Sequence, residues 1–288
     1  MTRDFKIVDV FSAAPFQGNP VAVVMNADGL RDEDMQQIAA WTNLSETTFH
    51  VRPTVPDADY RLRIFTPRSE LPFAGHPTLG SAHALIESGL VDAAGGHVVQ
   101  ECGAGLVPIS VEGAGAARVL RLQLPDAEMR DLTDAEQERL VTILGVPLVP
   151  DAQASLVDVG ARWIVAELDS AETVLNLMPD MAASAMFEAA LSVTGVTVFA
   201  MHSSGDGIEV RSFAPSCGVN EDPVCGSGNG SVAAYRLSRG QITDASNYIA
   251  TQGRCVGRSG QVHITAKAGR IYVGGQAVTT VDGKLTFA

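Results

Sequence analysis

Short runs of alternating or β-branched residues recur along the chain and predict β-strands in two series. The first series lies near residues 5–10, 20–25, 46–52, 60–66, 97–102, 106–112 and 117–124. The second lies near residues 155–159, 162–168, 196–201, 207–213, 261–266, 270–274 and 284–287. Because strands dominate both series and helical patterns are fewer, the chain favours an α+β fold over alternating βαβ units.

Three segments place apolar residues at helical spacing: residues 31–41, 133–145 and 181–191. The second has Thr133 and Glu136 spaced as a capping box and Gly145 as a stop signal. Two further helical segments, residues 77–89 and 223–240, are rich in Gly, Ala and Ser and lack a clean polar face until their ends. A helix without a polar face is buried all round. We therefore expect a central helix inside a strongly curved sheet, built twice.

Two sequence blocks are duplicated. Residues 63–67 (RIFTP) match residues 211–215 (RSFAP), and residues 75–81 (GHPTLGS) match residues 221–227 (EDPVCGS). The offsets are 211 − 63 = 148 and 222 − 76 = 146, so the copies differ by a two-residue loop. This distance exceeds the period of a repeat array and indicates two similar, pseudo-symmetric domains. We predict domains at residues 1–124 and 125–288, with a tail strand at 278–288 returning to the first.

Composition narrows the class of protein. The chain has 288 residues, 46% hydrophobic content and a net charge of −13, which fits two folded domains and disfavours a nucleic-acid partner. No apolar stretch is long enough to predict a membrane span, and the N-terminus lacks a signal-peptide pattern, so we expect a cytoplasmic protein. Four widely spaced cysteines without a CxxC motif give no support to a metal site, and most should be buried thiols.

The duplicated block predicts anion binding. Pro77 and Pro223 each begin a helical pattern, and proline is favoured at the first helical position. Asp222 is then expected to be the N-cap of the second helix. Unpaired amides and the positive end of the helix dipole attract anions, and a carboxylate is a suitable one. If both helix starts face one cleft, His76 and Asp222 lie opposite each other across it.

The copies differ at positions that matter chemically. Glu46 follows the first predicted helix, whereas the corresponding position of the second half holds Val196. A carboxyl group in such apolar surroundings should have a raised pKa, which suits a general acid/base. Cys225 stands where the first copy has Leu79, and a position at a helix N-terminus could lower the pKa of its thiol.

With these motifs, the chain resembles the PhzF (phenazine biosynthesis) family, within the group of diaminopimelate-epimerase-like folds. The resemblance runs nearly end to end and rests on residues 10–11, 15–20, 43–47, 75–78, 221–223, 226–227, 252–254 and 273–275. It implies two curved-sheet domains around central helices, a site between them and a homodimer. It also implies isomerisation of a small carboxylate by proton transfer between carbons, without a cofactor or metal. The founding activity of the family acts on trans-2,3-dihydro-3-hydroxyanthranilate.

The resemblance also implies the roles of single residues. Glu46 would be the proton-transferring acid/base. His76 and Asp222 would set its protonation: Asp222 would raise its pKa and a protonated His76 would lower it. The substrate-binding residues would be Gly75, Gly226, Ser227 and Asn19.

Two alternatives stay open. Cys225 could take part in an epimerase that uses one cysteine, alone or with Glu46, because the run Cys225-Gly226-Ser227 is similar to that of cysteine-dependent racemases. A second cysteine is missing, since its place is Leu79. The chain could also be a non-catalytic carboxylate-binding protein on the same scaffold.

Overall fold

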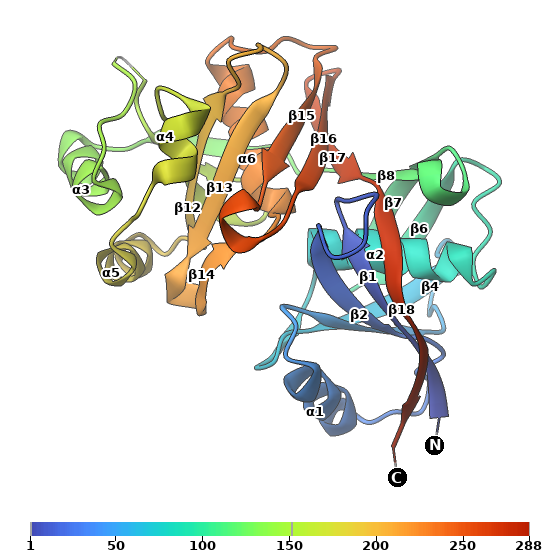
Figure 1. Cartoon of the computed structure of the whole chain (residues 1–288). Helices are drawn as coiled ribbons and strands as arrows, with labels where there is room; N and C mark the ends of the chain where they lie inside the picture. The colour runs from blue at the N-terminus through green and yellow to red at the C-terminus, as the bar shows by residue number, and fades with distance from the viewer. Residues whose placement is uncertain (1, 151, 288) are drawn as a thin grey trace. The chain divides into compact units, whose positions relative to one another are not determined.

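A computed structural model describes residues 2–150 and 152–287 and divides into two compact units. Unit 1 comprises the chain up to Leu122 and the stretch from Gly274 onward, and unit 2 comprises Gln123–Val273. Each unit has a curved sheet and one central helix, α2 in unit 1 and α6 in unit 2 (Figure 1). The α+β prediction is confirmed. Ala288, the last residue of the expected tail strand, lies outside the described residues.

Unit 1 contains mostly strands and two helices. Its helices are α1 (Asp32–Thr42) and α2 (Gly75–Glu87), with a 3₁₀ turn at Gly115–Ala117. Its strands are β1 (Thr2–Val10), β2 (Asn19–Val24), β3 (Thr47–Val51), β4 (Tyr60–Phe65), β5 (Glu70–Leu71), β6 (His97–Cys102), β7 (Gly105–Glu112), β8 (Val119–Gln123) and β18 (Ala277–Thr286). The last strand pairs antiparallel with β1, the first.

Unit 2 has more helices. They are α3 (Asp134–Leu144), α4 (Ala171–Asn176), α5 (Met181–Leu191) and α6 (Gly226–Ser238), with 3₁₀ turns at Pro215–Cys217 and Arg254–Val256. Its strands are β9 (Glu128–Asp131), β10 (Ser155–Asp158), β11 (Arg162–Glu167), β12 (Gly195–Met201), β13 (Ile208–Ala214), β14 (Val219–Asp222), β15 (Asn247–Gln252), β16 (Gly260–Lys267) and β17 (Arg270–Gly275).

The strand pairings repeat from one unit to the other. In unit 1 the succession β1-β2-β3-β4-β6-β7 is antiparallel, parallel, antiparallel, parallel and antiparallel. In unit 2 the succession β10-β11-β12-β13-β15-β16 follows the same pattern. The central helix occupies the same place in both successions, before β6 and before β15. The duplication seen in the sequence is therefore a duplication of topology.

Small residues allow the strands to approach the central helices closely. Residues 77–85 of α2 and residues 228–236 of α6 are all buried. A Cβ atom on Gly80 would come within 2.4 Å of Val21 Cγ1, and one on Gly230 within 2.2 Å of Leu124 Cδ1. Such distances leave no room for a methyl group, which explains the Gly- and Ala-rich composition of both helices.

The three amphipathic helices form as the sequence predicts. The capping box of α3 is present, with Thr133 Oγ1 accepting from the Glu136 amide, and Gly145 ends the helix in the left-handed region. The helices α1 and α5 match the segments 31–41 and 181–191 to within one residue. The short helix α4 has no counterpart in the prediction. Its six residues are too few for a periodic apolar pattern.

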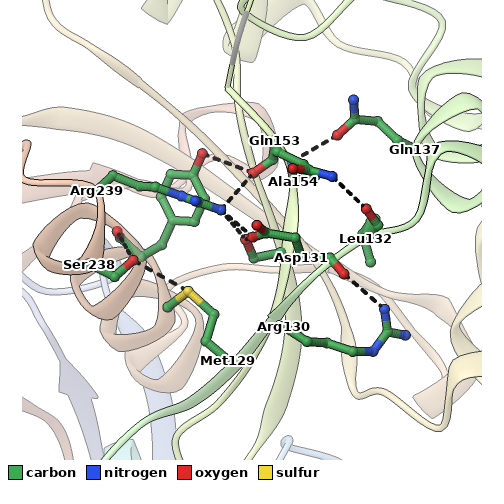
Figure 2. A network of polar contacts seen from close by, with 11 residues as sticks. Met129, Arg130, Asp131, Leu132, Gln137, Gln153, Ala154, Ser238 and Arg239 are labelled. Carbon is green, nitrogen blue, oxygen red and sulfur yellow. Dashed lines mark hydrogen bonds and ion pairs between the residues drawn. The ribbon is translucent and has the colours of Figure 1, made fainter.

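A network of polar contacts fixes the far end of α6 in unit 2 (Figure 2). Arg239, which ends the helix, donates to Asp131 of β9 and to Ser155 Oγ of β10, the latter at 2.9 Å. The Tyr235 hydroxyl donates to the carbonyl of Gln153 at 3.2 Å, and the Gln153 amide donates to the carbonyl of Leu132 at 2.9 Å. These contacts tie the C-terminal end of α6 to β9, to β10 and to the residues just before β10.

Two further predictions have structural outcomes. Among the described residues, no helix is both long and apolar enough to cross a membrane. Cys102 and Cys225 are buried, but Cys217 and Cys255 are exposed. The expectation that most of the thiols are buried is therefore wrong. Cys217 and Cys255 both lie in 3₁₀ turns, whose positions the sequence did not predict.

Candidate active site

Glu46 lies just before β3, at the end of a turn that the sequence specifies. Helix α1 ends at Asn43, which adopts the left-handed conformation (φ 54°) that asparagine tolerates better than most residues. Four residues later, at Thr47, the chain enters β3, and the Glu46 carbonyl accepts a hydrogen bond from the Ala22 amide of β2 at 3.4 Å. The Glu46 side chain is 15% exposed. The Glu46 backbone is thus held at the start of β3, and its carboxyl group is partly shielded from water.

His76 is the partner of Glu46. It lies in the first turn of α2, its side chain is 10% exposed, and its Nε2 atom is 3.4 Å from Glu46 Oε2. The carbonyl of Pro20 accepts a hydrogen bond from the ring. Burial lowers the pKa of His76 to about 3, so the ring is neutral at pH 7. The lowering of the Glu46 pKa by a protonated His76 does not operate at pH 7, because the desolvated ring is neutral there.

The hydrogen bond to Pro20 determines the tautomer of His76. Nε2 makes no hydrogen bond within the described residues, so the ring nitrogen that donates to the carbonyl is Nδ1. A neutral imidazole has one N–H, and Nε2 therefore carries a lone pair toward the Glu46 carboxyl group. A lone pair is a good acceptor for a carboxylic acid O–H and a poor neighbour for a carboxylate. Nε2 is therefore suited to accept a hydrogen bond when the Glu46 carboxyl group holds a proton.

The Gly18-Asn19-Pro20 turn contributes differently from the prediction. Asn19 was expected to line the substrate cleft, but the structure places it at the start of β2 with an exposure of 1%. Its neighbour Pro20 supplies the carbonyl that fixes His76. Gly18 is required here, since a Cβ atom would come within 2.3 Å of the Val10 carbonyl oxygen. Sequence reasoning missed Pro20 because a backbone carbonyl carries no residue-specific signal.

The start of α2 differs from the prediction. The helix begins at Gly75 rather than at Pro77, and its N-cap, Ala74, offers no side-chain acceptor. Pro77 is therefore the third helical residue, where its missing N–H still breaks no intrahelical bond. The amides of Gly75 and His76 lie in this first turn and are suited to an anionic ligand.

The corresponding prediction for unit 2 is also wrong. Helix α6 begins at Gly226, and its N-cap is Cys225, whose sulfur accepts from the Gly228 amide at 3.3 Å. Asp222 is not the cap. It ends β14, and its Oδ1 accepts from the Val224 amide at 3.0 Å in a local turn. Pro223 lies within this turn, so the N-cap of α6 is Cys225, three residues after Asp222.

Asp222 and Cys225 have perturbed pKa values. Burial raises the pKa of Asp222 to about 6, against the opposing effect of the hydrogen bonds from the Val224 amide and the Cys225 thiol. Burial and the charge of Asp222 raise the pKa of the Cys225 thiol well above its usual range. The expected lowering of the Cys225 pKa is thus contradicted, because desolvation outweighs the helix dipole. Cys225 is a protonated capping thiol in this arrangement.

Gln252 and Asn229 hold the start of α6 and were assigned no role by the sequence. Gln252 Oε1 accepts from the Cys225 amide at 3.1 Å and from Asn229 Nδ2 at 2.8 Å. Gln252 Nε2 donates to the Asp222 carbonyl at 2.9 Å. Both side chains are fully buried. A single buried amide therefore ties together Asp222, the cap and the first turn of the helix.

Ser227 completes the unit 2 cluster. Its Oγ accepts a hydrogen bond from Trp163 Nε1 at 3.0 Å and lies 3.6 Å from the Cys225 sulfur. Because Gly228 N–H is engaged by Cys225, the amides of Gly226 and Ser227 are those that a bound anion could use. Gly226 and Ser227 are both partly exposed.

The predicted site residues therefore form two clusters. Unit 1 carries Glu46 and His76 in contact, with Gly75 one residue before His76 in the same turn. Unit 2 carries Asp222, Cys225 and the Gly226-Ser227 pair within one turn and the first residues of α6. In the part of the chain that is described, no group of three or more His, Cys, Asp or Glu side chains could hold a metal ion.

The chain is similar to known proteins along nearly its whole length. A sequence profile of the family described as "Phenazine biosynthesis-like protein" (PhzC-PhzF) matches residues 8–283. The chain is 42% identical to a Schizosaccharomyces pombe protein named "Antisense-enhancing sequence 1", over 98% of each chain. It is 32% identical to the trans-2,3-dihydro-3-hydroxyanthranilate isomerase of Pseudomonas aeruginosa, over 96% of this chain and 94% of that protein.

Solved structures extend the agreement to the fold. The structure of a PhzF-family phenazine biosynthesis protein from Bacillus anthracis superposes with a TM-score of 0.88 over the full length of both chains, at 23% identity. A PhzF-family protein from Enterococcus faecalis gives a TM-score of 0.81 at 29% identity, again over both full lengths. With these matches added to the duplicated topology, the chain belongs to the PhzF family, has its diaminopimelate-epimerase-like fold and is an isomerase.

Proposed function

We propose that this isomerase moves a proton between two carbons of a small carboxylate, with trans-2,3-dihydro-3-hydroxyanthranilate or a close analogue as substrate and without a cofactor. The contact between Glu46 and His76 is the observation that carries the proposal. The relatives named for this reaction, such as the enzyme from Pseudomonas aeruginosa, support the choice of substrate class.

Glu46 is the proposed acid/base. As a carboxylate it takes a proton from one carbon, and the electron pair of the broken C–H bond passes into the conjugated system of the substrate. As a carboxylic acid it returns the proton to a second carbon, so atoms and charge balance and no oxidant is needed. The His76 Nε2 lone pair accepts a hydrogen bond from the acid form and thereby stabilises the state between the two transfers.

The remaining groups bind and polarise the substrate in this proposal. The proposed binding residues are Gly75, Gly226 and Ser227, because first-turn amides and a hydroxyl are suited to a carboxylate. Such preorganised donors also stabilise the enolate-like charge that develops when a C–H proton leaves. Asp222, with a pKa of about 6, is a further group that changes its charge in the pH range of the reaction. Asn19 acts indirectly, by fixing the turn that contains Pro20.

Substitution of Glu46 by Gln tests the proposal. We expect turnover to fall by about 10³-fold or more, since general acid/base groups contribute roughly 10²–10⁴-fold and this group makes both transfers. The reaction is followed by NMR in deuterated water, where wild-type protein should introduce deuterium into the substrate. Glu33→Gln, at an exposed position of α1, is the matched control. Turnover retained in Glu46→Gln would contradict the proposal.

The homodimer and the cytoplasmic location stay predictions. Light scattering on the purified chain checks the first, with a mass of about twice 30.2 kDa expected for a dimer. Fractionation of the source cells checks the second.

A further inference from the structure

Trp163 makes one polar contact that the reaction as proposed does not use. The residue lies in β11, is 2% exposed, and donates from Nε1 to Ser227 Oγ at 3.0 Å. Its ring is held tightly, because a Cβ atom on Gly195 would come within 2.7 Å of Trp163 Cζ3. A buried indole N–H usually finds an acceptor, and here that acceptor is a hydroxyl at the helix start.

This contact dictates what the Ser227 hydroxyl can do. An indole N–H is a donor only, so the hydroxyl cannot use its own proton on Trp163. The other close group is the Cys225 sulfur, 3.6 Å from Ser227 Oγ, and either atom could be the donor in that contact. A thiol sulfur is a weak acceptor, so a stronger acceptor can take the Ser227 O–H away from it. A carboxylate oxygen is the acceptor that a partly exposed hydroxyl beside free helix amides would meet.

We propose that Trp163 is a positioning residue for carboxylate recognition: its indole N–H orients the Ser227 hydroxyl so that the hydroxyl proton points to the substrate. The inference rests on the proposed function in one respect, namely that Ser227 binds the carboxylate of the substrate. The Trp163 indole would then also report carboxylate binding. A carboxylate that accepts a hydrogen bond from Ser227 makes the Ser227 oxygen a stronger acceptor for the indole N–H.

Kinetics of the Trp163→Phe variant give the first test, with trans-2,3-dihydro-3-hydroxyanthranilate as substrate. We expect KM to rise about tenfold, equivalent to ~1.4 kcal/mol, with kcat changed by less than about twofold. The double variant Trp163→Phe/Ser227→Ala should be no worse than Ser227→Ala alone, since Trp163 acts through Ser227. Additive losses would overturn the inference.

The chain offers a matched control and a direct spectroscopic readout. It has two tryptophans, and the other, Trp41, is 75% exposed on α1. Trp41→Phe should leave KM unchanged. ¹⁵N-labelled wild-type protein therefore gives two indole N–H signals. The Trp163→Phe and Trp41→Phe variants assign each signal to its residue. Ser227→Ala should move the Trp163 signal upfield, because the hydrogen bond is lost, and should leave the Trp41 signal in place.

Ligand binding then separates this inference from the proposed function. Titration with benzoate or with the dihydro-hydroxyanthranilate should move the Trp163 signal downfield in wild-type protein and not in Ser227→Ala. If Glu46→Gln still turns over while the signal moves, the function is wrong and the inference stands. If a substrate turns over without moving the signal, the inference is wrong and the function stands. The wild-type titration keeps the test valid even if Trp163→Phe fails to fold.

Discussion

The two copies of the Arg-x-Phe-x-Pro block have the same geometry but very different surroundings. Arg63 and Arg211 both lie over the phenylalanine two residues later, at 5.2 and 4.9 Å from the ring centroid. Arg63 pairs with Glu70 at 2.7 Å, and these side chains are 19% and 43% exposed. Arg211 pairs with Glu221, also at 2.7 Å, at exposures of 6% and 9%. Both copies therefore keep the arginine–phenylalanine and arginine–glutamate contacts. The burial of the ion pair decides how much it contributes to stability.

In the second copy, the buried arginine makes two further hydrogen bonds. Arg211 Nη1 also donates to the carbonyls of Val174 and Leu177, at 3.0 and 2.8 Å, and so caps the C-terminal end of α4. The corresponding segment of unit 1 has no such helix, and Arg63 instead reaches Asp32, which is 75% exposed. A conserved contact thus supports the core of unit 2 but only the surface of unit 1.

The two units also differ in the polar side chains at their candidate site residues. Unit 1 places a carboxyl group and a neutral imidazole in contact through Glu46 and His76. Unit 2 has the buried Val196 at the position of Glu46 and uses its polar groups, led by Gln252, to fix a helix start. Unit 1 thus carries the proposed proton-transferring pair, and unit 2 carries a helix start held by buried hydrogen bonds.

The largest expected effect tests the difference in burial between the two arginines. Arg211→Ala should lower the free energy of unfolding by about 3–5 kcal/mol, because it leaves Glu221 buried and unpaired. Arg63→Ala should cost about 1 kcal/mol or less, since its partners stay solvated. Urea denaturation of both variants measures the difference. Equal losses of unfolding free energy in the two variants would show that burial does not determine how much this contact stabilises each unit.

The next effect is pH-dependent and specific to unit 2. The folded pKa of Asp222, about 6, lies above the unfolded value of about 4, so ionising Asp222 costs stability as pH rises through this window. Asp222→Asn should therefore be stabilised by up to about 2 kcal/mol at pH 8, with the gain vanishing below pH 4. Thermal melts across pH 4–8 measure it.

The rate profile of the same variant gives an independent check. If Asp222 influences the protonation of Glu46, the pH dependence of kcat/KM should lose an inflection near pH 6 in Asp222→Asn. A variant whose stability curve changes while its rate profile does not would restrict Asp222 to a structural role.

The smallest effect concerns the cysteines and the epimerase alternative. Because burial and Asp222 raise its pKa, Cys225 should react with iodoacetamide at pH 8 at least about tenfold more slowly than the exposed Cys217. Peptide mass spectrometry of partially alkylated protein gives both rates in one sample. Faster reaction at Cys225 would favour the one-cysteine mechanism again.

Periodic patterns and repeated blocks predicted the fold well. The capping box at Thr133 and the Gly- and Ala-rich central helices depend on local residue types, which sequence reveals directly. Glu46 and His76 were chosen as candidates because the two halves differ at those positions, and the structure brings their side chains to 3.4 Å. The helix starts were misplaced, because the choice between Asp222 and Cys225 as cap depends on a turn closed by a backbone amide.

What the sequence could not reveal is the set of groups that act from a distance. Pro20 acts through its carbonyl, and Gln252 and Trp163 come from strands far along the chain from the residues that they fix. Such contacts require the register of the sheet, which no local pattern contains. Desolvation, which lowers the pKa of His76 and reverses the expected shift in the pKa of Cys225, is likewise a tertiary property.

The position of β18 has a consequence for biosynthesis. Unit 1 is discontinuous: its first strand, β1, pairs along its length with β18, which is synthesised after all of unit 2, whereas unit 2 is one uninterrupted segment. Domains usually fold in the order of synthesis, N-terminal first. Here unit 2 can fold before unit 1 is complete, because unit 1 also needs β18, which is synthesised after unit 2. A nascent chain halted before Ala277 would leave the β1 edge open to wrong partners.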